Sequence, residues 1–406
     1  MLSYDDALAH ILAAIPEPTA SEPVALKSAR GRVLAEDLFA AENLPSFANS
    51  AVDGFAVRFA DVADARPERP VRIRVTQTIA AGFPPDGPIH PGEGARILTG
   101  AIVPNGCERI VMVEDSRPVV GGDGEFVDLT DPGSAGHVRP AGSDIPVGAR
   151  AVSAGVALEA GEIGVLAALN QAQVPCRRRP RVGLIVTGDE IVTVGTLPLA
   201  LGQIRNSNGP ALVAAIAEAG GEVVFNLRAG DTIQATREAL RACVGCDVIV
   251  STGGVSVGTY DYVKAAVEEV GTLDFWRIAI KPGKPLAFGR LGSALFFGLP
   301  GNPVSSLVTF ELFVRPALRR LGGFAQPLRR VVSVTLVEPV PHTPGRREFI
   351  RASLTWENGG FTAMPTGAQG SHRLSSLLVA DAYLIAHEDH DDYATGETLP
   401  ALLLRA

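Results

Sequence analysis

The feature that most constrains the fold is a regular alternation of apolar, strand-like runs with amphipathic helical runs, which begins after Arg177. Strands are expected at 182–186, 223–227, 247–250, 275–280, 286–288 and 294–297. Helices are expected at 211–219, from Asp231 onward, at 262–270 and at 303–321. Such alternation is typical of an α/β fold with a parallel sheet covered on both faces, and these folds bind ligands beyond the carboxyl ends of the strands.

The remainder of the chain predicts further domains, since its 406 residues exceed the roughly 100 to 150 of a typical domain. Apolar residues follow a helical period at 2–12, 26–38 and 155–172, whereas 45–139 and 328–406 contain short β-like runs. We predict an α/β plus β protein with four domains. They are an N-terminal helical and extended domain of residues 1–44 and 140–176, an inserted mainly β domain at 45–139, the α/β domain at 177–326 and a small C-terminal β-barrel at 327–406.

Composition and charge exclude several classes of protein. The net charge is -8 and is spread along the chain, whereas a nucleic-acid-binding protein would show a basic face. No apolar stretch reaches the length of a membrane span, and Asp5 and Asp6 stand where a signal peptide would carry lysine or arginine. We therefore expect a soluble, cytoplasmic protein. Cys243 and Cys246 have C-x-x-C spacing but follow a predicted helix, so packing is favoured over a redox role.

Polar residues of the predicted α/β domain follow its strands at the points where the strands end. The first strand runs into Asp189 and Glu190 and the second into Asp231. Later strands run into TGGVSVG followed by Asp261, into KPGKP with Lys281 and Lys284, and into GLPGNP at 298–303. Because the carboxyl ends of parallel strands meet at one edge, these groups are expected on one rim.

This combination of groups favours a phosphorylated ligand bound together with a divalent metal. Glycine turns that lead into helices offer backbone N–H groups to phosphate, and carboxylates beside an anion need a hard cation such as Mg²⁺. Simpler explanations stay open: Asp231 as a helix N-cap, Asp189 and Glu190 as solvated loop charges, and Gly253 and Gly254 as packing residues. Neither the P-loop motif nor the dinucleotide-binding motif occurs.

The predicted β insertion has a polar signal of its own. The run 45–56 places Asn49, Ser50 and Asp53 around a glycine turn, and similar turns occur at 99–101 and 142–144. Burying such groups is costly unless they are hydrogen-bonded or used by a ligand, so both a structural and a functional role stay open.

Nine segments together resemble the molybdopterin molybdenumtransferase family, which includes the MoeA proteins and the E domain of gephyrin. They are PSFANSAVDGFAVR, LTGAIVPNG, RPAGSDI, RPRVGLIVTGDEIV, GQIRNSN, STGGVSVGTYDYV, AIKPGKPLAFG, GLPGNPVSSLVTFE and GRREFIR. They occur in the family's order and span nearly the whole chain, so the likeness is specific.

The resemblance implies the final step of molybdenum cofactor synthesis. In that step molybdate is inserted into the dithiolene of adenylylated molybdopterin and AMP is released, with Mg²⁺ as the metal. It also implies an elongated homodimer, with a site shared between subunits, and further cofactor-synthesis proteins as candidate partners. Two alternatives stay open: adenylylation of molybdopterin from ATP, and a non-catalytic scaffold such as gephyrin.

Roles for individual residues follow from the same resemblance. The implied catalytic residues are Asp53, Thr99, Asp144, Glu190, Asp231, Asp261, Lys281 and Lys284. Of these, Glu190, Asp231 and Asp261 are the implied metal ligands. The implied substrate-binding residues are Gly253, Gly254, Ser256, Gly258, Pro300, Gly301, Asn302, Pro303, Ser305, Arg346, Arg351 and Ser371.

The sequence departs from the family pattern at a few of these places. Ser143, Asn206 and Thr259 stand where the family commonly has an acid, and Val52 stands where it commonly has methionine. The three lost acids remove negative charge near the expected rim. The absence of these acids therefore predicts that the metal is bound more weakly, or that its ligands are divided differently among the remaining residues.

Overall fold

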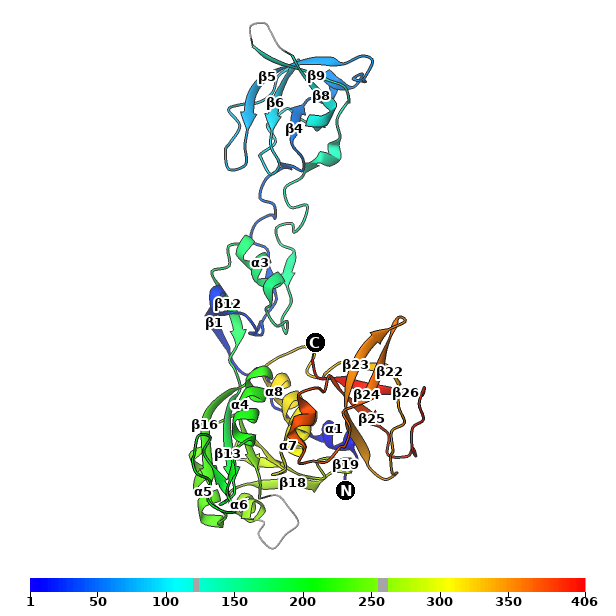
Figure 1. Cartoon of the computed structure of the whole chain (residues 1–406). Coiled ribbons are helices and arrows are strands. Elements are labelled where there is room, and N and C mark those ends of the chain that lie inside the picture. Colours follow the sequence, from blue (N-terminus) through cyan, green and yellow to red (C-terminus); the bar gives the residue numbers. More distant parts are fainter. Residues whose placement is uncertain (120–123, 255–261, 406) are drawn as a thin grey trace. The chain divides into compact units, whose positions relative to one another are not determined.

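The computed structural model describes residues 1–119, 124–254 and 262–405, which divide into two compact units. The first unit consists of Met1–Glu36, Ala154–Glu159 and Val174–Ala406. The second consists of Asp37–Ser153 and Ala160–Gln173. Figure 1 shows the elements of both units along the chain. The first unit contains the predicted α/β domain and the predicted barrel, and the second contains the β insertion.

A six-stranded sheet forms the centre of the first unit, in the order β16-β13-β17-β21-β20-β18. Its strands are β13 (Arg181–Thr187), β16 (Glu222–Ala229), β17 (Val248–Thr252), β18 (Thr272–Arg277), β20 (Pro285–Leu291) and β21 (Ala294–Leu299). The pairs among β16, β13, β17 and β21 are parallel, whereas β20 is antiparallel to both of its neighbours, β21 and β18. The α/β prediction is confirmed, but the sheet is mixed, because the short β20–β21 connection has no room for a parallel crossover.

Helices cover both faces of this sheet. They are α1 (Tyr4–Ala14), α4 (Asn208–Glu218), α5 (Ile233–Ala242), α6 (Tyr262–Val270), α7 (Pro303–Thr309), the π-helix η4 (Phe310–Val314) and α8 (Arg315–Leu321). Successive side chains of β13 enter different cores: Leu184 belongs to the core that includes residues of α1, α4, α7 and α8, and Ile185 belongs to the core that includes residues of α5 and α6. This alternation is expected of a strand buried on both faces.

The cysteines of the C-x-x-C pair are buried free thiols in the core beneath α5 and α6. Burial raises the pKa of the Cys243 thiol to about 12, so this side chain stays protonated. The packing interpretation of the pair is therefore confirmed.

The C-terminal part of the first unit is a closed barrel of five strands. They are β22 (Val331–Leu336), β23 (Arg347–Glu357), β24 (Gly360–Pro365), β25 (Ala382–Ala386) and β26 (Thr398–Leu403), and η5 (Leu374–Leu377) lies between β24 and β25. The pairing of β25 with β23 closes the ring, which confirms the predicted small barrel. The short strand β19 (Ile280–Lys281) adds to β23 and so joins the α/β part to the barrel.

The helix predicted at 26–38 does not form. The segment contains only the short 3-10 turn η1 (Leu26–Ser28), then Gly31 with φ 70°, and then an extended stretch. Val33 forms an isolated β-bridge with Ala157, and Leu34 forms one with Cys176. Chain pairing thus buries both apolar side chains. The spacing of apolar residues alone does not distinguish this kind of burial from the buried face of a helix. Nearby, β1 (Ser21–Ala25) pairs with β12 (Gln173–Arg177).

The second unit is mainly β. Its six-stranded sheet has the order β7-β4-β6-β5-β9-β8. The strands are β4 (Gly54–Val57), β5 (Val71–Ile79), β6 (Glu93–Ile97), β7 (Arg109–Met112), β8 (Ser116–Val119) and β9 (Glu125–Leu129). Smaller elements are β2 (Leu38–Phe39), β3 (Asn49–Ser50), α2 (Phe59–Val62), η2 (Val113–Asp115), η3 (Ala135–His137), β10 (Val138–Arg139), β11 (Arg150–Val152) and α3 (Ala160–Ala168). The mainly β character predicted for residues 45–139 is therefore confirmed.

Within the described residues, no helix combines the length and the apolar character needed to cross a membrane.

Candidate functional site

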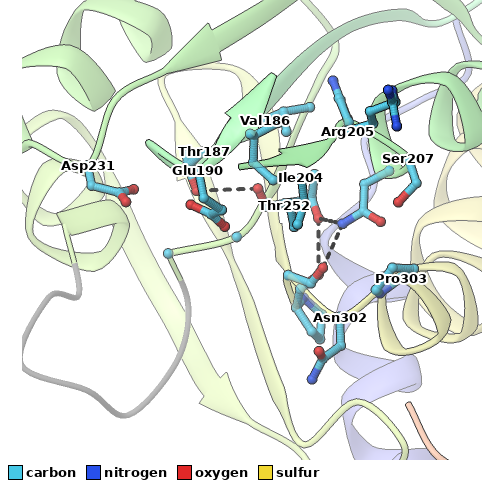
Figure 2. A pocket seen from close by; sticks show the side chains of 18 of the residues that line it. Val186, Thr187, Glu190, Ile204, Arg205, Ser207, Asp231, Thr252, Asn302 and Pro303 are labelled. Atoms are coloured by element: carbon cyan, nitrogen blue, oxygen red, sulfur yellow. Dashed lines mark hydrogen bonds between the residues drawn. The ribbon is translucent and has the colours of Figure 1, made fainter. Parts of the chain in front are cut away.

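A cavity of about 470 Å³ lies at the carboxyl ends of the parallel strands in the first unit (Figure 2). Its lining residues are Val186, Thr187, Gly188, Glu190, Ile191, Ile204, Arg205, Asn206, Ser207, Asn208, Asp231, Thr252, Gly253, Gly254, Pro285, Pro300, Gly301, Asn302 and Pro303. They come from the ends of β13, β16, β17 and β21, from the start of β20, and from the segment 204–208 that leads into α4. The cavity therefore occupies the rim at which ligands of open α/β sheets bind.

Thr252, at the end of β17, organises the floor of the cavity. Its side chain is buried, and its Oγ1 donates to the Pro300 carbonyl oxygen at 3.0 Å. Nδ2 of Asn208 donates to the same Oγ1 at 2.9 Å and to the Gly301 carbonyl oxygen at 2.8 Å. These bonds join the end of β17, the start of α4 and the turn before α7, as the dashed lines in Figure 2 show. Thr252 is the first residue of the TGGVSVG run expected on the rim, but no role of its own was predicted for it.

Replacing Thr252 with valine should lower the free energy of unfolding by about 1–3 kcal/mol, the usual cost of a buried polar group left without its partner. Valine has the shape of threonine, but it can neither donate to Pro300 nor accept from Asn208. Urea unfolding measures the loss. The control is Thr272→Val on the exposed edge strand β18, which should change stability by less than about 0.5 kcal/mol. Equal effects of the two variants would contradict the proposed role of Thr252.

Two acidic residues from neighbouring strand ends, Glu190 and Asp231, line the cavity. Asp231 does not cap α5, because that role belongs to Thr232, whose side chain accepts from the N–H of Ala235 at 3.1 Å. The Asp231 carboxylate accepts instead from the N–H of Asp189 at 3.2 Å, and the N–H of Asp231 donates back to Asp189 at 3.2 Å. The N-cap explanation of Asp231 is thus wrong, and this reciprocal pair positions the carboxylate at the cavity wall.

A short parallel pair of strands forms the wall beside Glu190. It consists of β14 (Ile191–Val192) and β15 (Ile204–Arg205). The N–H of Ile204 donates to the Glu190 carbonyl oxygen at 2.9 Å, which fixes the backbone of this acid. Asn206, one of the positions where the family usually has an acid, also lines the cavity and accepts from the N–H of Gly209 at 2.8 Å.

The predicted metal ligands are partly brought together. Glu190 and Asp231 share the cavity, and Asp261 lies outside the described residues, as do Ser256, Gly258 and Thr259. Among the residues that are described, no group of three or more histidine, cysteine, aspartate or glutamate side chains could hold a metal ion. The described part of the site therefore supplies two carboxylates.

Two turns of the predicted substrate site line the cavity. Gly253 and Gly254 have φ values of 94° and 65°, a conformation that favours glycine. The adjacent turn contributes Pro300, Gly301, Asn302 and Pro303, with Pro303 as the first residue of α7. Ser305 is buried inside α7 and is not among the described lining residues.

The two predicted lysines are not among the described residues that line the cavity, although Pro285, which follows Lys284, is. Lys281 lies in β19, and its ammonium pairs with Glu348 of the barrel at 3.0 Å. The pairing of β19 with β23 draws this lysine toward the barrel. The convergence expected from the strand ends therefore holds for the acids and the glycine turns rather than for the lysines.

Of the residues predicted in the C-terminal region, Ser371 lies in a loop that contacts α7, and Arg351 contacts the same loop. Arg351 is fully buried, and its Nε donates to the Ser376 hydroxyl at 2.7 Å. The loop between them carries Ser371, whose carbonyl oxygen accepts from the N–H of Val304 at 3.2 Å. Arg346 is half-buried in the turn before β23. None of the three predicted residues, Arg346, Arg351 and Ser371, belongs to the described cavity lining.

The three predicted residues of the second unit lie at its turns. Thr99 donates to the Asp53 carboxylate from both its N–H and its hydroxyl, each at 2.7 Å. These bonds to Thr99, together with the charge of Arg96, hold the pKa of Asp53 below its usual value. Asp144 is exposed, and its N–H donates to the Leu44 carbonyl oxygen at 3.0 Å. Asp53 and Thr99 thus form one local group.

Replacing Thr99 with valine should raise the pKa of Asp53 toward the ordinary value of about 3.9. The native pKa is lowered, so the contribution of this contact to stability is complete at neutral pH and is lost only as the pH falls below about 4. A carbon-13 NMR titration of the carboxyl group measures the shift. Thr78→Val, at an exposed position of β5, is the control. An Asp53 pKa that is the same in both variants would contradict the assignment.

Comparison with known proteins covers almost the whole chain. Residues 2–170 match the MoeA N-terminal region (domain I and II), 183–320 match a probable molybdopterin binding domain, and 333–404 match the MoeA C-terminal region (domain IV). The molybdopterin molybdenumtransferase of Haemophilus influenzae is 34% identical over 405 residues, which cover 98% of each chain. The chain belongs to the molybdopterin molybdenumtransferase family.

Other members of the molybdopterin molybdenumtransferase family agree with this assignment. Molybdopterin molybdenumtransferase 2 of Mycobacterium tuberculosis is 38% identical over 93% of each chain. Gephyrin of Dictyostelium discoideum is 33% identical over 94% of this chain and 59% of that protein. The crystal structure of the molybdopterin biosynthesis MoeA protein from Pyrococcus horikoshii superposes with a TM-score of 0.85 at 30% identity, and covers 99% of this chain. The resemblance carried by the nine sequence segments is confirmed.

Proposed function

We propose that this chain is a molybdopterin molybdenumtransferase, which catalyses molybdenum insertion in the final step of molybdenum cofactor synthesis. The observation that carries the proposal is similarity over nearly the full length to relatives that bear this name. The adenylyltransferase alternative is favoured less, because the molybdenumtransferases match nearly the whole chain. The scaffold alternative is tested by the release of AMP, as described below. The substrates would be adenylylated molybdopterin and molybdate, with AMP as the second product.

The cavity is suited to the phosphorylated end of such a substrate. Its lining includes the two glycine turns and Ser207. Backbone N–H groups in turns of this kind bind phosphate oxygens well. Little covalent chemistry is required of the protein in cleaving a phosphoanhydride, so positioning and charge stabilisation would account for most of the catalysis.

The donor set of the cavity fits Mg²⁺. Glu190 and Asp231 offer only oxygen atoms, and Mg²⁺ commonly binds one or two carboxylates together with phosphate oxygens. Glu190 and Asp231 would hold the ion, with Asp261 as the third ligand implied by the family. When bound, Mg²⁺ would offset negative charge on the phosphate oxygens. The reciprocal bonds between Asp189 and Asp231 would keep the second carboxylate in place whether or not the ion is present.

The remaining predicted residues have supporting roles in this proposal. Lys284, next to Pro285 at the cavity edge, would attract the anionic substrate, and Lys281 would do so from the barrel side. Molybdate is a tetrahedral dianion, and lysine and serine donors suit it. A homodimer, a cytoplasmic location and further cofactor-synthesis proteins as partners also belong to the proposal. Light scattering of the purified protein tests the dimer.

Release of AMP decides between the proposed function and its rivals. The protein is incubated with adenylylated molybdopterin, Mg²⁺ and increasing molybdate, and AMP and molybdenum-loaded molybdopterin are quantified. Molybdate-dependent formation of both products is the expected result. In a parallel reaction with ATP and free molybdopterin, net consumption of ATP would favour adenylylation instead. Stoichiometric partner binding without any AMP release would favour a scaffold.

A further inference from the structure

The barrel strand β23 carries a buried carboxylate, Glu348, that contacts a lysine of the predicted site. Its Oε1 lies 3.0 Å from Nζ of Lys281 and its Oε2 lies 3.1 Å from the same nitrogen. Nδ1 of His342 lies 3.2 Å from Oε2. The exposed fraction is 5% for the Glu348 side chain and 1% for His342, but 49% for Lys281. The carboxylate is thus enclosed, whereas half of the lysine remains open to solvent.

His342 holds this carboxylate in place. Its Nε2 lies 3.0 Å from the His387 carbonyl oxygen, which can only accept, so Nε2 carries a proton. Its Nδ1 lies within hydrogen-bond distance of a carboxylate oxygen of Glu348. The backbone N–H of His342 donates to the Asp392 carboxylate at 2.7 Å. The Glu348 carboxylate is buried and contacts both Lys281 and His342, so it has little freedom to move.

The backbone adds a second restraint on the lysine. Strand β19 pairs in parallel with β23, with Lys281 opposite Glu348. The chain then continues through the loop 282–284 to Pro285, which lines the cavity and begins β20. The barrel is therefore linked to the cavity edge through the residues that directly follow the paired lysine.

We propose that Glu348, held by His342, is a positioning residue that fixes the Lys281 ammonium for an oxyanion of the substrate. This inference rests on the proposed function. An ammonium group has three N–H donors, and its exposed half can still donate to an anion after Glu348 has been satisfied. A lysine that is already fixed loses less side-chain entropy when the anion binds. Glu348 would thus raise the affinity for the anion without touching it.

A neighbouring ion pair offers a matched control. Arg347, one residue before Glu348 on β23, pairs with Glu388 at 2.8 Å, and both side chains are largely enclosed. The same amide substitution can be made in both pairs, as E348Q and E388Q. Both variants lose one carboxylate charge from the same barrel, but only E348Q breaks a contact with Lys281.

The first measurement does not depend on enzyme activity. The proteins are treated with limiting acetic anhydride, and acetylation of Lys281 is followed by peptide mass spectrometry with Lys284 as the internal reference. We expect Lys281 in E348Q to react about tenfold faster than in wild type, because its amine is no longer held by a carboxylate. The loss of a hydrogen bond between charged groups corresponds to about a tenfold change in an equilibrium constant. E388Q should match wild type. Equal rates in all three proteins would overturn the proposal.

The second measurement is kinetic. E348Q should raise KM by about tenfold for the substrate whose oxyanion meets Lys281, with a smaller change in kcat. KM is determined for molybdate and for adenylylated molybdopterin, and the substrate whose KM rises identifies the anion. In a Lys281→Met background, E348Q should have no further effect on KM. An additional effect there would show that Glu348 acts by another route and would overturn the proposal.

Two further results keep the outcome interpretable. If E348Q does not fold, H342Q takes its place, with faster acetylation of Lys281 than in wild type as the expected result and an unchanged rate as the contradicting one. If the wild-type chain releases no AMP, the proposed function fails. The acetylation ratio would still decide whether Glu348 fixes Lys281.

Discussion

Replacing Gly253 with alanine should destabilise the first unit by about 2–4 kcal/mol, the range of substitutions that combine strain with a clash. A Cβ atom at this position would lie 2.5 Å from the Thr187 hydroxyl oxygen and 2.7 Å from the Thr187 carbonyl oxygen. The φ of 94° would strain alanine in addition. Because β13 and β17 are adjacent, the clash would push apart two strands whose ends line the cavity. Substrate affinity should therefore fall together with stability.

Gly202 provides the matched control for this prediction. Its φ of 87° is similar, but a Cβ atom there would have no neighbour within 4 Å. Gly202→Ala should therefore cost only the backbone strain, about 1 kcal/mol. Chemical unfolding of both variants measures the difference, which isolates the clash from the strain. A Gly253→Ala protein as stable as Gly202→Ala would contradict the close approach of β13 and β17 at this turn.

Replacing Asp231 with asparagine should reduce molybdate-dependent AMP release by about 10²- to 10³-fold, the effect typical of removing one group that stabilises developing charge. Asparagine keeps the size of the side chain and an oxygen that can accept from the N–H of Asp189. It removes one of the two described carboxylates that face the cavity. The fold should therefore be retained while binding of a divalent cation weakens.

Cation binding is measured separately from activity by electron paramagnetic resonance of Mn²⁺ used in place of Mg²⁺. Glu238→Gln makes the same charge change on the exposed face of α5 and should leave Mn²⁺ affinity and AMP release unchanged. Asp231→Asn should weaken Mn²⁺ binding relative to this control. Unchanged affinity and turnover in Asp231→Asn would remove Asp231 from the proposed site.

Much of the cavity could be predicted because its residues follow strand ends. Parallel strands place their carboxyl ends on one edge, so Glu190, Asp231 and Gly253 were expected together once the strands had been recognised, and they line one cavity. The barrel was equally predictable, since the residues 328–406 contain a series of short β-like runs. These features depend on local patterns, which a single sequence contains.

Other features depend on contacts between distant segments, and these were missed or misjudged. The N-cap of α5 is Thr232 rather than Asp231, because the backbone of Asp189 recruits the aspartate. The helix expected at 26–38 is replaced by bridges to Ala157 and Cys176. In the same way, β20 runs antiparallel because its connection to β21 is short.

The amino-acid order alone established the α/β fold class, the barrel and the family, because periodicity, turn residues and the nine matching segments are properties of consecutive residues. The placement of the lysine and arginine side chains was decided by the assembled fold. Lys281 pairs with the buried Glu348 because β19 pairs with β23, and the buried Arg351 of the same strand donates to the Ser376 hydroxyl and to the Gly370 carbonyl oxygen. A charge that is satisfied by a residue far along the chain has no signature in its neighbouring sequence, and its partner appears only when the two strands lie side by side.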